Sequence, residues 1–206
     1  EEAHLHPRLT MRALCEYLVD QVRFIEEART PEDFGDAWVV DCRGIVCADN
    51  DPDLRGVKGE LLVVRNTEYS LQRPVRLMHP RYPLYVVPRD DHHFMIGASI
   101  IEASDSGHVS LRSAMELMSG LYALSPSFGD ADIIEMRSGI RPSYPDNLPR
   151  VTCNDNVIRC NGMFRHGYLL SPVMAGYVVD IIMGQHNKYA DLLGKKNYEG
   201  DDQRAA

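Results

Sequence analysis

The sequence has no excess of basic residues, no long apolar run and no signal-peptide pattern. Its 22 lysines and arginines are outnumbered by 30 aspartates and glutamates, which gives a formal net charge of −8. It has no cluster of basic and aromatic side chains either, so nucleic acid is not an expected partner. No apolar stretch approaches the ~20 residues that a membrane-spanning helix requires. These absences predict a cytoplasmic protein with no membrane partner.

Closely spaced cysteine pairs are also missing. The five cysteines are an odd number, and no two of them form a C-x-x-C pair. Disulfide frameworks and structural zinc sites usually show such spacings, so we expect reduced thiols. His4 and His6 alternate as metal ligands can, but no cysteine or carboxylate lies at ligand spacing from them. No metal site is therefore predicted.

What is present is enough for a sizeable core, because the 206 residues are 44% hydrophobic and 25% charged. A first helix is expected from Pro7, since proline suits the first helical position, with an apolar face that continues to Ile25. A second helix is expected after Ser110, whose hydroxyl can cap it. A third is expected over Pro172–Met183, with Ser171 as its cap.

Short apolar and β-branched runs between these helices predict strands. The runs are residues 37–41, 60–65, 84–88, 93–97, 131–141 and 157–160. The Asp-rich segment 89–92 suits a hairpin turn, so the strands on either side of it should pair antiparallel. The sequence therefore predicts an α+β fold, a mixed, largely antiparallel sheet with flanking helices. Trp38, in the first strand, is expected in the core.

Four short motifs follow one another along this pattern. They are LRGVKGELLVV (54–64), LYVVPRDD (84–91), SGIRPSYPDNLP (138–149) and NGMFRHGYLLSP (161–172). Each is loose by itself, but the order of all four is specific. Together they resemble the C-terminal part of the ThiO-like glycine oxidases, in the D-amino-acid and sarcosine oxidase group of FAD-dependent oxidoreductases. The resemblance extends from about Leu5 to Met183.

The resemblance implies an enzyme in which FAD oxidises glycine or a similar small amine acid to its imine by hydride transfer, as part of thiamine biosynthesis. Oxygen is the implied electron acceptor. The substrate would be bound by Tyr85, Arg141 and Arg165, and no catalytic acid–base residue is required. The positions implied for cofactor binding are Gly44, Arg165, His166, Gly167, Tyr168 and Leu169.

One departure from the family is large. Binding of the FAD pyrophosphate requires a G-x-G-x-x-G turn, and no two of the 15 glycines stand two residues apart. Residues 1–194 are therefore expected to form a substrate domain together with the C-terminal piece of an FAD domain, followed by a polar tail at 195–206. Such a chain alone should bind FAD weakly or not at all. Cys42 and Arg43 also depart from the family pattern, so only Gly44 matches in that turn.

Other interpretations stay open at this point. The protein can be a related flavoenzyme with another amine substrate or electron acceptor, or a non-catalytic module that binds carboxylates or another protein. Tyr85 can be a packed aromatic residue, and Arg141 can form a structural ion pair. Assembly into a homo-oligomer is equally open.

Overall fold

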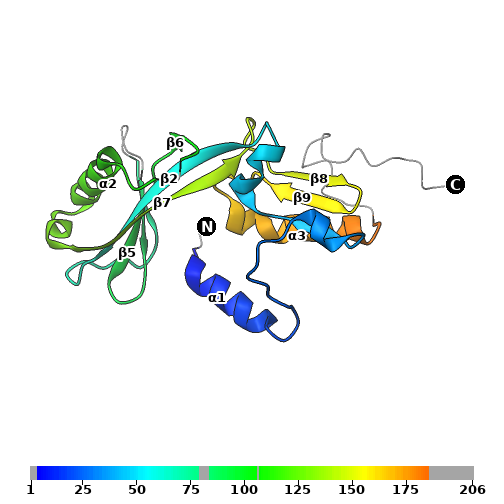
Figure 1. Cartoon of the computed structure of the whole chain (residues 1–206). Helices are drawn as coiled ribbons and strands as arrows, with labels where there is room; N and C mark the ends of the chain where they lie inside the picture. Colours follow the sequence, from blue (N-terminus) through cyan, green and yellow to red (C-terminus); the bar gives the residue numbers. More distant parts are fainter. Residues whose placement is uncertain (1–3, 79–83, 106, 186–206) are drawn as a thin grey trace. The chain divides into compact units, whose positions relative to one another are not determined.

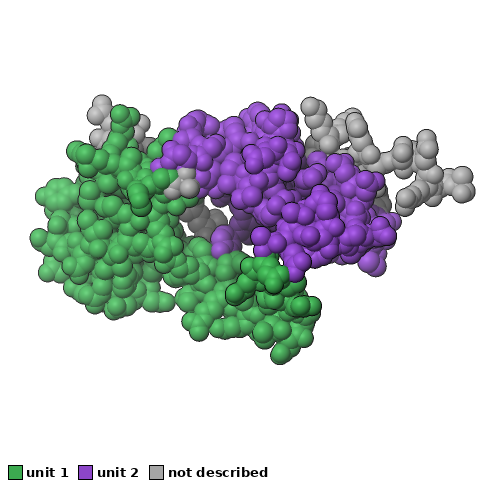
Figure 2. All heavy atoms as spheres, in the orientation of Figure 1, with its two compact units in different colours: residues 1–27, 59–101, 106–139 green, residues 28–58, 102–105, 140–206 purple. Residues whose placement is uncertain are grey.

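The computed structural model describes residues 4–78, 84–105 and 107–185. The chain divides into two compact units, each built from segments that are distant in the sequence (Figure 2). Unit 1 comprises residues 1–27, 59–101 and 106–139, and unit 2 comprises residues 28–58, 102–105 and 140–206. The predicted polar tail at 195–206, with its boundary at 194, lies outside the described residues.

A six-stranded sheet is the framework of unit 1, and three of its strands also contribute residues to unit 2. The strands are β2 (Arg55–Arg65), β3 (Val75–Leu77), β4 (Leu84–Pro88), β5 (His93–Gly97), β6 (Ile101–Glu102) and β7 (Asp132–Ser143). Their order is β3-β4-β5-β2-β6, and β7 also pairs with β2 (Figure 1). The β2–β5, β3–β4 and β4–β5 pairs are antiparallel, which confirms the predicted sheet type.

The β4–β5 hairpin has the bounds that the sequence predicts. Its turn places Asp91 and His92 at φ values of 52° and 57°, in the left-handed region. Two such residues in succession give a turn whose twist matches that of the flanking strands. The turn thereby fixes the register in which Tyr85 faces Gly97 across the pair.

The core of unit 1 lies between this sheet and the helix α2 (Leu111–Leu124). Alternate side chains of β2, β4 and β5 point to this side, as the two-residue period of a strand requires. The buried cluster comprises Leu62, Val64, Leu84, Val86, Phe94, Ile96, Leu117, Leu121 and, from the short helix η3 (Pro126–Asp130), Phe128. The predicted cap of α2 is confirmed, because the Ser110 hydroxyl accepts a hydrogen bond from the Ser113 N–H.

Helix α1 (Pro7–Leu18) begins at the predicted proline but is shorter than the sequence pattern indicates. Its amino end is capped by the His6 ring, which accepts a hydrogen bond from the Leu9 N–H at 3.3 Å. The helix ends at Leu18, so Ile25 lies outside it, and none of its residues is buried. An apolar period can continue past the point at which the backbone leaves the helix, which is why the pattern alone overestimated its length.

Unit 2 is built on a three-stranded sheet in the order β1-β9-β8 (Figure 1). The strands are β1 (Val39–Asp41), β8 (Arg150–Asn154) and β9 (Val157–Asn161). β1 and β9 run parallel, whereas β8 and β9 form an antiparallel hairpin. Helix α3 (Gly167–Ile182) shares a core with this sheet that includes Val151, Ile158, Cys160, Met174, Tyr177 and Val178. The short helices η1 (Pro31–Phe34) and η2 (Gly44–Asn50) flank β1.

The predicted start of the last helix is wrong. α3 begins at Gly167 with His166 as its N-cap, and Pro172 lies inside the helix. The Ser171 hydroxyl does not cap the helix, because it donates a hydrogen bond to the Gly167 carbonyl at 2.7 Å. A serine in the second turn of a helix can bond back to the carbonyl four residues earlier, and a Ser-Pro pair fits both situations.

Two further expectations in unit 2 differ from the structure. Trp38 is 46% exposed instead of lying in the core. Strand β8 was not predicted, because residues 150–154 are largely polar and only Val151 among them is buried. The strand forms through its pairing with β9 across the tight turn at Asp155, which has φ 52°. Pairing partners of this kind override weak local propensity.

Candidate functional site

Tyr85 lies on β4 in unit 1, where its ring crosses the backbone of Gly97 on the neighbouring strand. A methyl group added at Gly97 would meet the Tyr85 hydroxyl oxygen at 2.5 Å, which is closer than side chains approach. Gly97 is buried and Tyr85 is half-buried. The absence of a side chain at position 97 therefore lets the phenol lie flat over the strand.

Arg141 lies in the part of β7 that belongs to unit 2, and it is half-buried. The next residue, Pro142, has a carbonyl that accepts a hydrogen bond from the Phe164 N–H at 3.1 Å. Arg165 follows Phe164 directly. The backbones that carry the two arginines are thus joined, although 24 positions separate the residues in the chain.

Gly44 lies beside Pro142, at the place where these two segments are joined. It has φ 67°, and a methyl group added there would lie 3.7 Å from the Pro142 ring. The buried amide of Asn161 connects this turn to the end of β9, because its Nδ2 donates to the Gly44 carbonyl at 2.8 Å. The Asn161 Oδ1 accepts a hydrogen bond from the Gly162 N–H, also at 2.8 Å. Sequence reasoning missed Asn161, although an Asn-Gly pair after a strand is a recognisable turn signal.

The amino end of α3 follows immediately. Arg165 and His166 are exposed, and the first turn of the helix contains Tyr168 and Leu169, which are exposed as well. The free N–H groups and dipole of a helix start favour negative charge. Five of the six predicted cofactor positions therefore lie in one short segment of unit 2, at residues 165–169.

The surroundings of Gly44 and Gly162 have features of a ligand site at the end of parallel strands. The parallel strands β1 and β9 are each followed by a glycine with positive φ, 67° at Gly44 and 78° at Gly162. Helix α3 then begins beyond the end of β9. In α/β sheets, ligands bind outside the carboxyl ends of parallel strands, where glycine turns allow close approach and helix starts face anionic groups.

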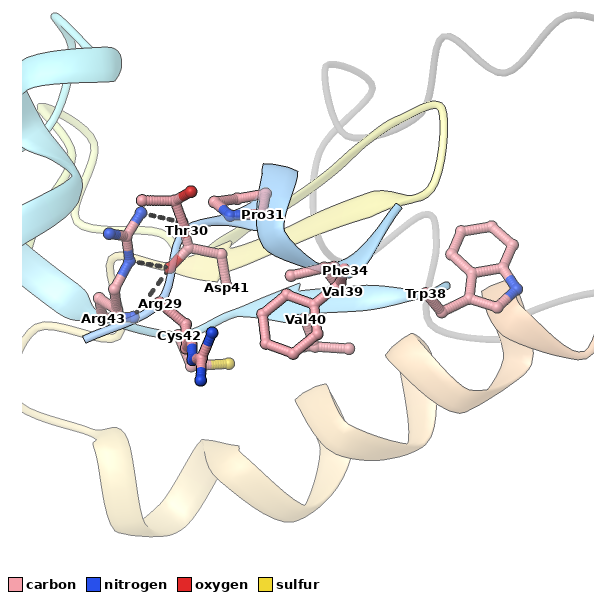
Figure 3. A pocket seen from close by; sticks show the side chains of 10 residues that line it. All are labelled: Arg29, Thr30, Pro31, Phe34, Trp38, Val39, Val40, Asp41, Cys42 and Arg43. Carbon is pink, nitrogen blue, oxygen red and sulfur yellow. Dashed lines mark hydrogen bonds and ion pairs between the residues drawn. The ribbon is translucent and has the colours of Figure 1, made fainter. Parts of the chain in front are cut away.

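A pocket of about 300 Å³ lies in unit 2 beside β1 (Figure 3). At one end, Arg43 grips Asp41 with two hydrogen bonds, Nε to Oδ1 at 2.9 Å and Nη2 to Oδ2 at 2.8 Å. Oδ1 also accepts hydrogen bonds from the Arg43 backbone N–H at 3.2 Å and from the Cys47 thiol at 3.3 Å. These bonds, led by that from Arg43, lower the pKa of Asp41 to about 2 against the opposing effect of burial. The pair holds the Cys42–Gly44 turn in place.

The Asp41–Arg43 pair predicts a defined dependence of stability on pH. The folded-state pKa of Asp41 lies below its unfolded value of 3.8, so its contribution is fully present above about pH 4 and is lost as the pH falls through about 2. Since the carboxylate is only 5% exposed, the contribution is about 2 kcal/mol. Asp41→Asn should therefore lower the free energy of unfolding at pH 7 by about that amount, and the deficit should shrink between pH 4 and pH 2. Urea unfolding at several pH values measures it.

The matched control for this measurement is Asp49→Asn, which changes an exposed carboxylate of η2. The free energy of unfolding of Asp49→Asn should vary with pH in the same way as that of the unchanged chain. An Asp41→Asn deficit that stays constant from pH 7 to pH 2 would show that the ionised carboxylate contributes nothing and that the loss is one of packing.

The fold is that of an FAD-dependent oxidoreductase. Residues 1–181 match the family described as FAD dependent oxidoreductase, and the chain belongs to that family. The match covers both units of the structure.

Among its relatives is a Rhizobium etli protein described as the thiamine biosynthesis oxidoreductase ThiO, which is 49% identical over 179 residues. That match covers 86% of this chain and 55% of the relative. A glycine oxidase from Bacillus licheniformis is 30% identical over 131 residues, covering 62% of this chain and 34% of the relative. The crystal structure of glycine oxidase from Geobacillus kaustophilus superimposes with a TM-score of 0.67 at 26% identity, covering 77% of this chain and 45% of that one. The chain thus spans about half the length, or less, of these relatives.

The predicted site residues are distributed over both units. Tyr85 belongs to unit 1, whereas Gly44, Arg141 and the segment 165–169 belong to unit 2. Their roles in binding stay predictions. The described residues include no group of three or more His, Cys, Asp and Glu side chains that could hold a metal ion. In the same part of the chain, no helix is both long and apolar enough to cross a bilayer.

Proposed function

We propose that this protein, in its full length, is an FAD-dependent oxidase of glycine or a similarly small amine acid that acts in thiamine biosynthesis. The observation that carries the proposal is that the Gly44 turn, Pro142 and Phe164 lie together beyond β1 and β9. The Asn161 amide donates to the Gly44 carbonyl, and the Phe164 N–H donates to the Pro142 carbonyl. This arrangement brings two of the four motifs by which the sequence resembles the glycine oxidases, residues 138–149 and 161–172, to the turn at Gly44. The similarity to ThiO and to glycine oxidases supports the choice of substrate and pathway.

In this proposal the FAD-binding residues of the chain are Gly44 and the segment 165–169. When bound, FAD supplies an acceptor for a hydride from the substrate α-carbon. The glycine turn at Gly44 leaves room for close approach of a flat ring. The amino end of α3 would hold an anionic or electron-rich part of the cofactor, because its free N–H groups and dipole favour negative charge. The side chains of Tyr168 and Leu169 are exposed and would supply apolar surface to the bound cofactor.

The substrate carboxylate is assigned to Arg141 and Tyr85. A guanidinium offers two parallel N–H donors that match a carboxylate, and a phenol adds one neutral hydrogen bond. Gly97 matters here because it lets the Tyr85 ring lie flat across β5. Arg165 adds positive charge near cofactor and substrate. The residues act by orienting the amine acid with its α-carbon toward the acceptor, so no side chain has to form a covalent bond.

The remaining parts of the proposal concern partners and location. Molecular oxygen is the proposed final electron acceptor, and the cytoplasm is the proposed compartment. Neither nucleic acid nor a membrane takes part. Assembly into a homo-oligomer stays open and is measured by sedimentation of the full-length protein.

The test of this function uses the purified full-length protein. It should be yellow, retain flavin after desalting, and release hydrogen peroxide when glycine is added, faster than with amino acids that have large side chains. If the reduced protein passes electrons to a dye but not to oxygen, oxygen is not the electron acceptor. A colourless, folded protein that binds glycine without flavin would contradict the enzyme and point to a carboxylate-binding module.

A further inference from the structure

Cys42 and Cys160 are neighbours across the two parallel strands of unit 2. The register pairs Val39 with Val157 and Asp41 with Arg159. The next residue in each segment is a cysteine, Cys42 directly after the end of β1 and Cys160 within β9. Facing positions of adjacent strands lie about 5 Å apart with their side chains on the same face of the sheet. The two thiols are in hydrogen-bond contact. This spacing is within the range of Cα separations that a disulfide can bridge.

The two sulfurs have unequal access to solvent. Cys42 is exposed and lines the pocket of about 300 Å³ beside β1 (Figure 3). Cys160 is 5% exposed and belongs to the core between the sheet and α3. A small polar molecule that enters the pocket can therefore reach the Cys42 sulfur, while the Cys160 sulfur lies behind it.

The electrostatic setting divides the two thiols further. The hydrogen bond with Cys160 lowers the pKa of Cys42 to about 7, although burial and the Asp41 carboxylate oppose the shift. The same hydrogen bond, with burial, raises the pKa of Cys160. Arg43 neutralises Asp41, and Arg29 also lines the pocket. At neutral pH a larger share of Cys42 is therefore thiolate than of an ordinary cysteine.

We propose that Cys42 and Cys160 form a peroxide-sensitive dithiol that closes to a disulfide. The Cys42 thiolate attacks one oxygen of hydrogen peroxide, so that an S–O bond forms, the O–O bond breaks and hydroxide leaves to become water. The Cys160 sulfur then attacks the Cys42 sulfenic sulfur, an S–S bond forms and a second water leaves. In sum, two thiols and one peroxide give one disulfide and two waters.

A Cys42–Cys160 disulfide would lie next to the turn that contains Gly44. Cys42 directly precedes Arg43 and Gly44, and the Gly44 carbonyl is held by Asn161, the residue after Cys160. The disulfide therefore adds a covalent link beside an existing hydrogen bond, at the turn proposed above to approach the cofactor. The site responds to peroxide from any source, so the inference does not rest on the proposed oxidase activity.

The experiment treats the reduced 206-residue chain with one equivalent of hydrogen peroxide at pH 7. Thiols titrated after denaturation should fall from five to three, and peptide mapping by mass spectrometry should find Cys42 linked to Cys160. The rate should fall between pH 7 and pH 5.5, because the thiolate and not the thiol attacks peroxide. Circular dichroism and cooperative unfolding establish that the chain is folded, and a parallel reaction in urea shows whether the link requires the fold.

Two variants complete the test. Cys153→Ser removes a half-buried thiol on β8 and should still lose two thiols, from four to two. Cys42→Ser changes an exposed position and should keep all four of its thiols over the same time. The inference is overturned if the folded chain forms no Cys42–Cys160 link, if Cys42 is oxidised to a sulfinic or sulfonic acid instead, or if the same pairs form equally in urea.

Discussion

Replacement of Arg141 by leucine in the full-length protein is expected to lower kcat/KM for glycine by about 30-fold to several thousand-fold. The loss corresponds to roughly 2–5 kcal/mol, because a two-bond, charge-assisted grip on the substrate carboxylate disappears and the carboxylate is left desolvated without a partner. Flavin should remain bound, since Arg141 is assigned to the substrate. Steady-state turnover and the flavin-to-protein ratio are measured together.

Two matched variants separate the role of Arg141 from a general effect. Arg141→Lys should recover only part of the activity, because an ammonium group lacks the planar fork. Tyr85→Phe should cost less, about 0.5–1.5 kcal/mol for one neutral hydrogen bond. An Arg141→Leu enzyme that keeps both flavin and kcat/KM would remove the carboxylate assignment. If that variant loses its flavin, Arg141 has a structural role instead.

Replacement of Gly162 by alanine is expected to lower the free energy of unfolding by about 2–5 kcal/mol. Gly162 has φ 78°, which costs an L-residue about 1–2 kcal/mol, and the added methyl group would lie 2.3 Å from the Tyr144 ring. Overpacking of this kind typically costs a further 1–3 kcal/mol. The ring cannot easily move, since it is buried, its hydroxyl donates to Asp51 at 2.7 Å, and the Arg150 guanidinium lies 4.0 Å above it.

The control for Gly162 is another glycine of unit 2. Gly176 is exposed on α3, and among the described residues an added methyl group would meet no atom within 4 Å outside its own helix. Gly176→Ala should therefore stabilise the chain by about 0.5–1 kcal/mol, because alanine is the better helix former. Urea unfolding of both variants gives the comparison. Equal midpoints for the two would contradict the close contact between Gly162 and Tyr144.

Local chemistry was sufficient wherever neighbouring residues decide the structure. The β4–β5 hairpin has the predicted bounds because an Asp-rich turn joins two apolar runs, and α2 begins after Ser110 because a serine hydroxyl reaches the helix N–H groups. The start of α3 was predicted wrongly, since Ser171 and Pro172 fit both a cap and a second turn. Trp38 was predicted in the core from its residue type alone, yet its side chain is exposed.

The sequence by itself determined the family, the α+β class and the candidate residues, because these depend on short motifs and on periodicities that are read within a few positions. Only the tertiary structure decided which distant residues meet. The parallel register of β1 and β9 brings Cys42 to Cys160, and the Asn161 amide ties Gly44 to the turn before α3. More than 110 residues separate these partners in the chain. Their meeting depends on how strands pair and pack, and no local pattern encodes that pairing.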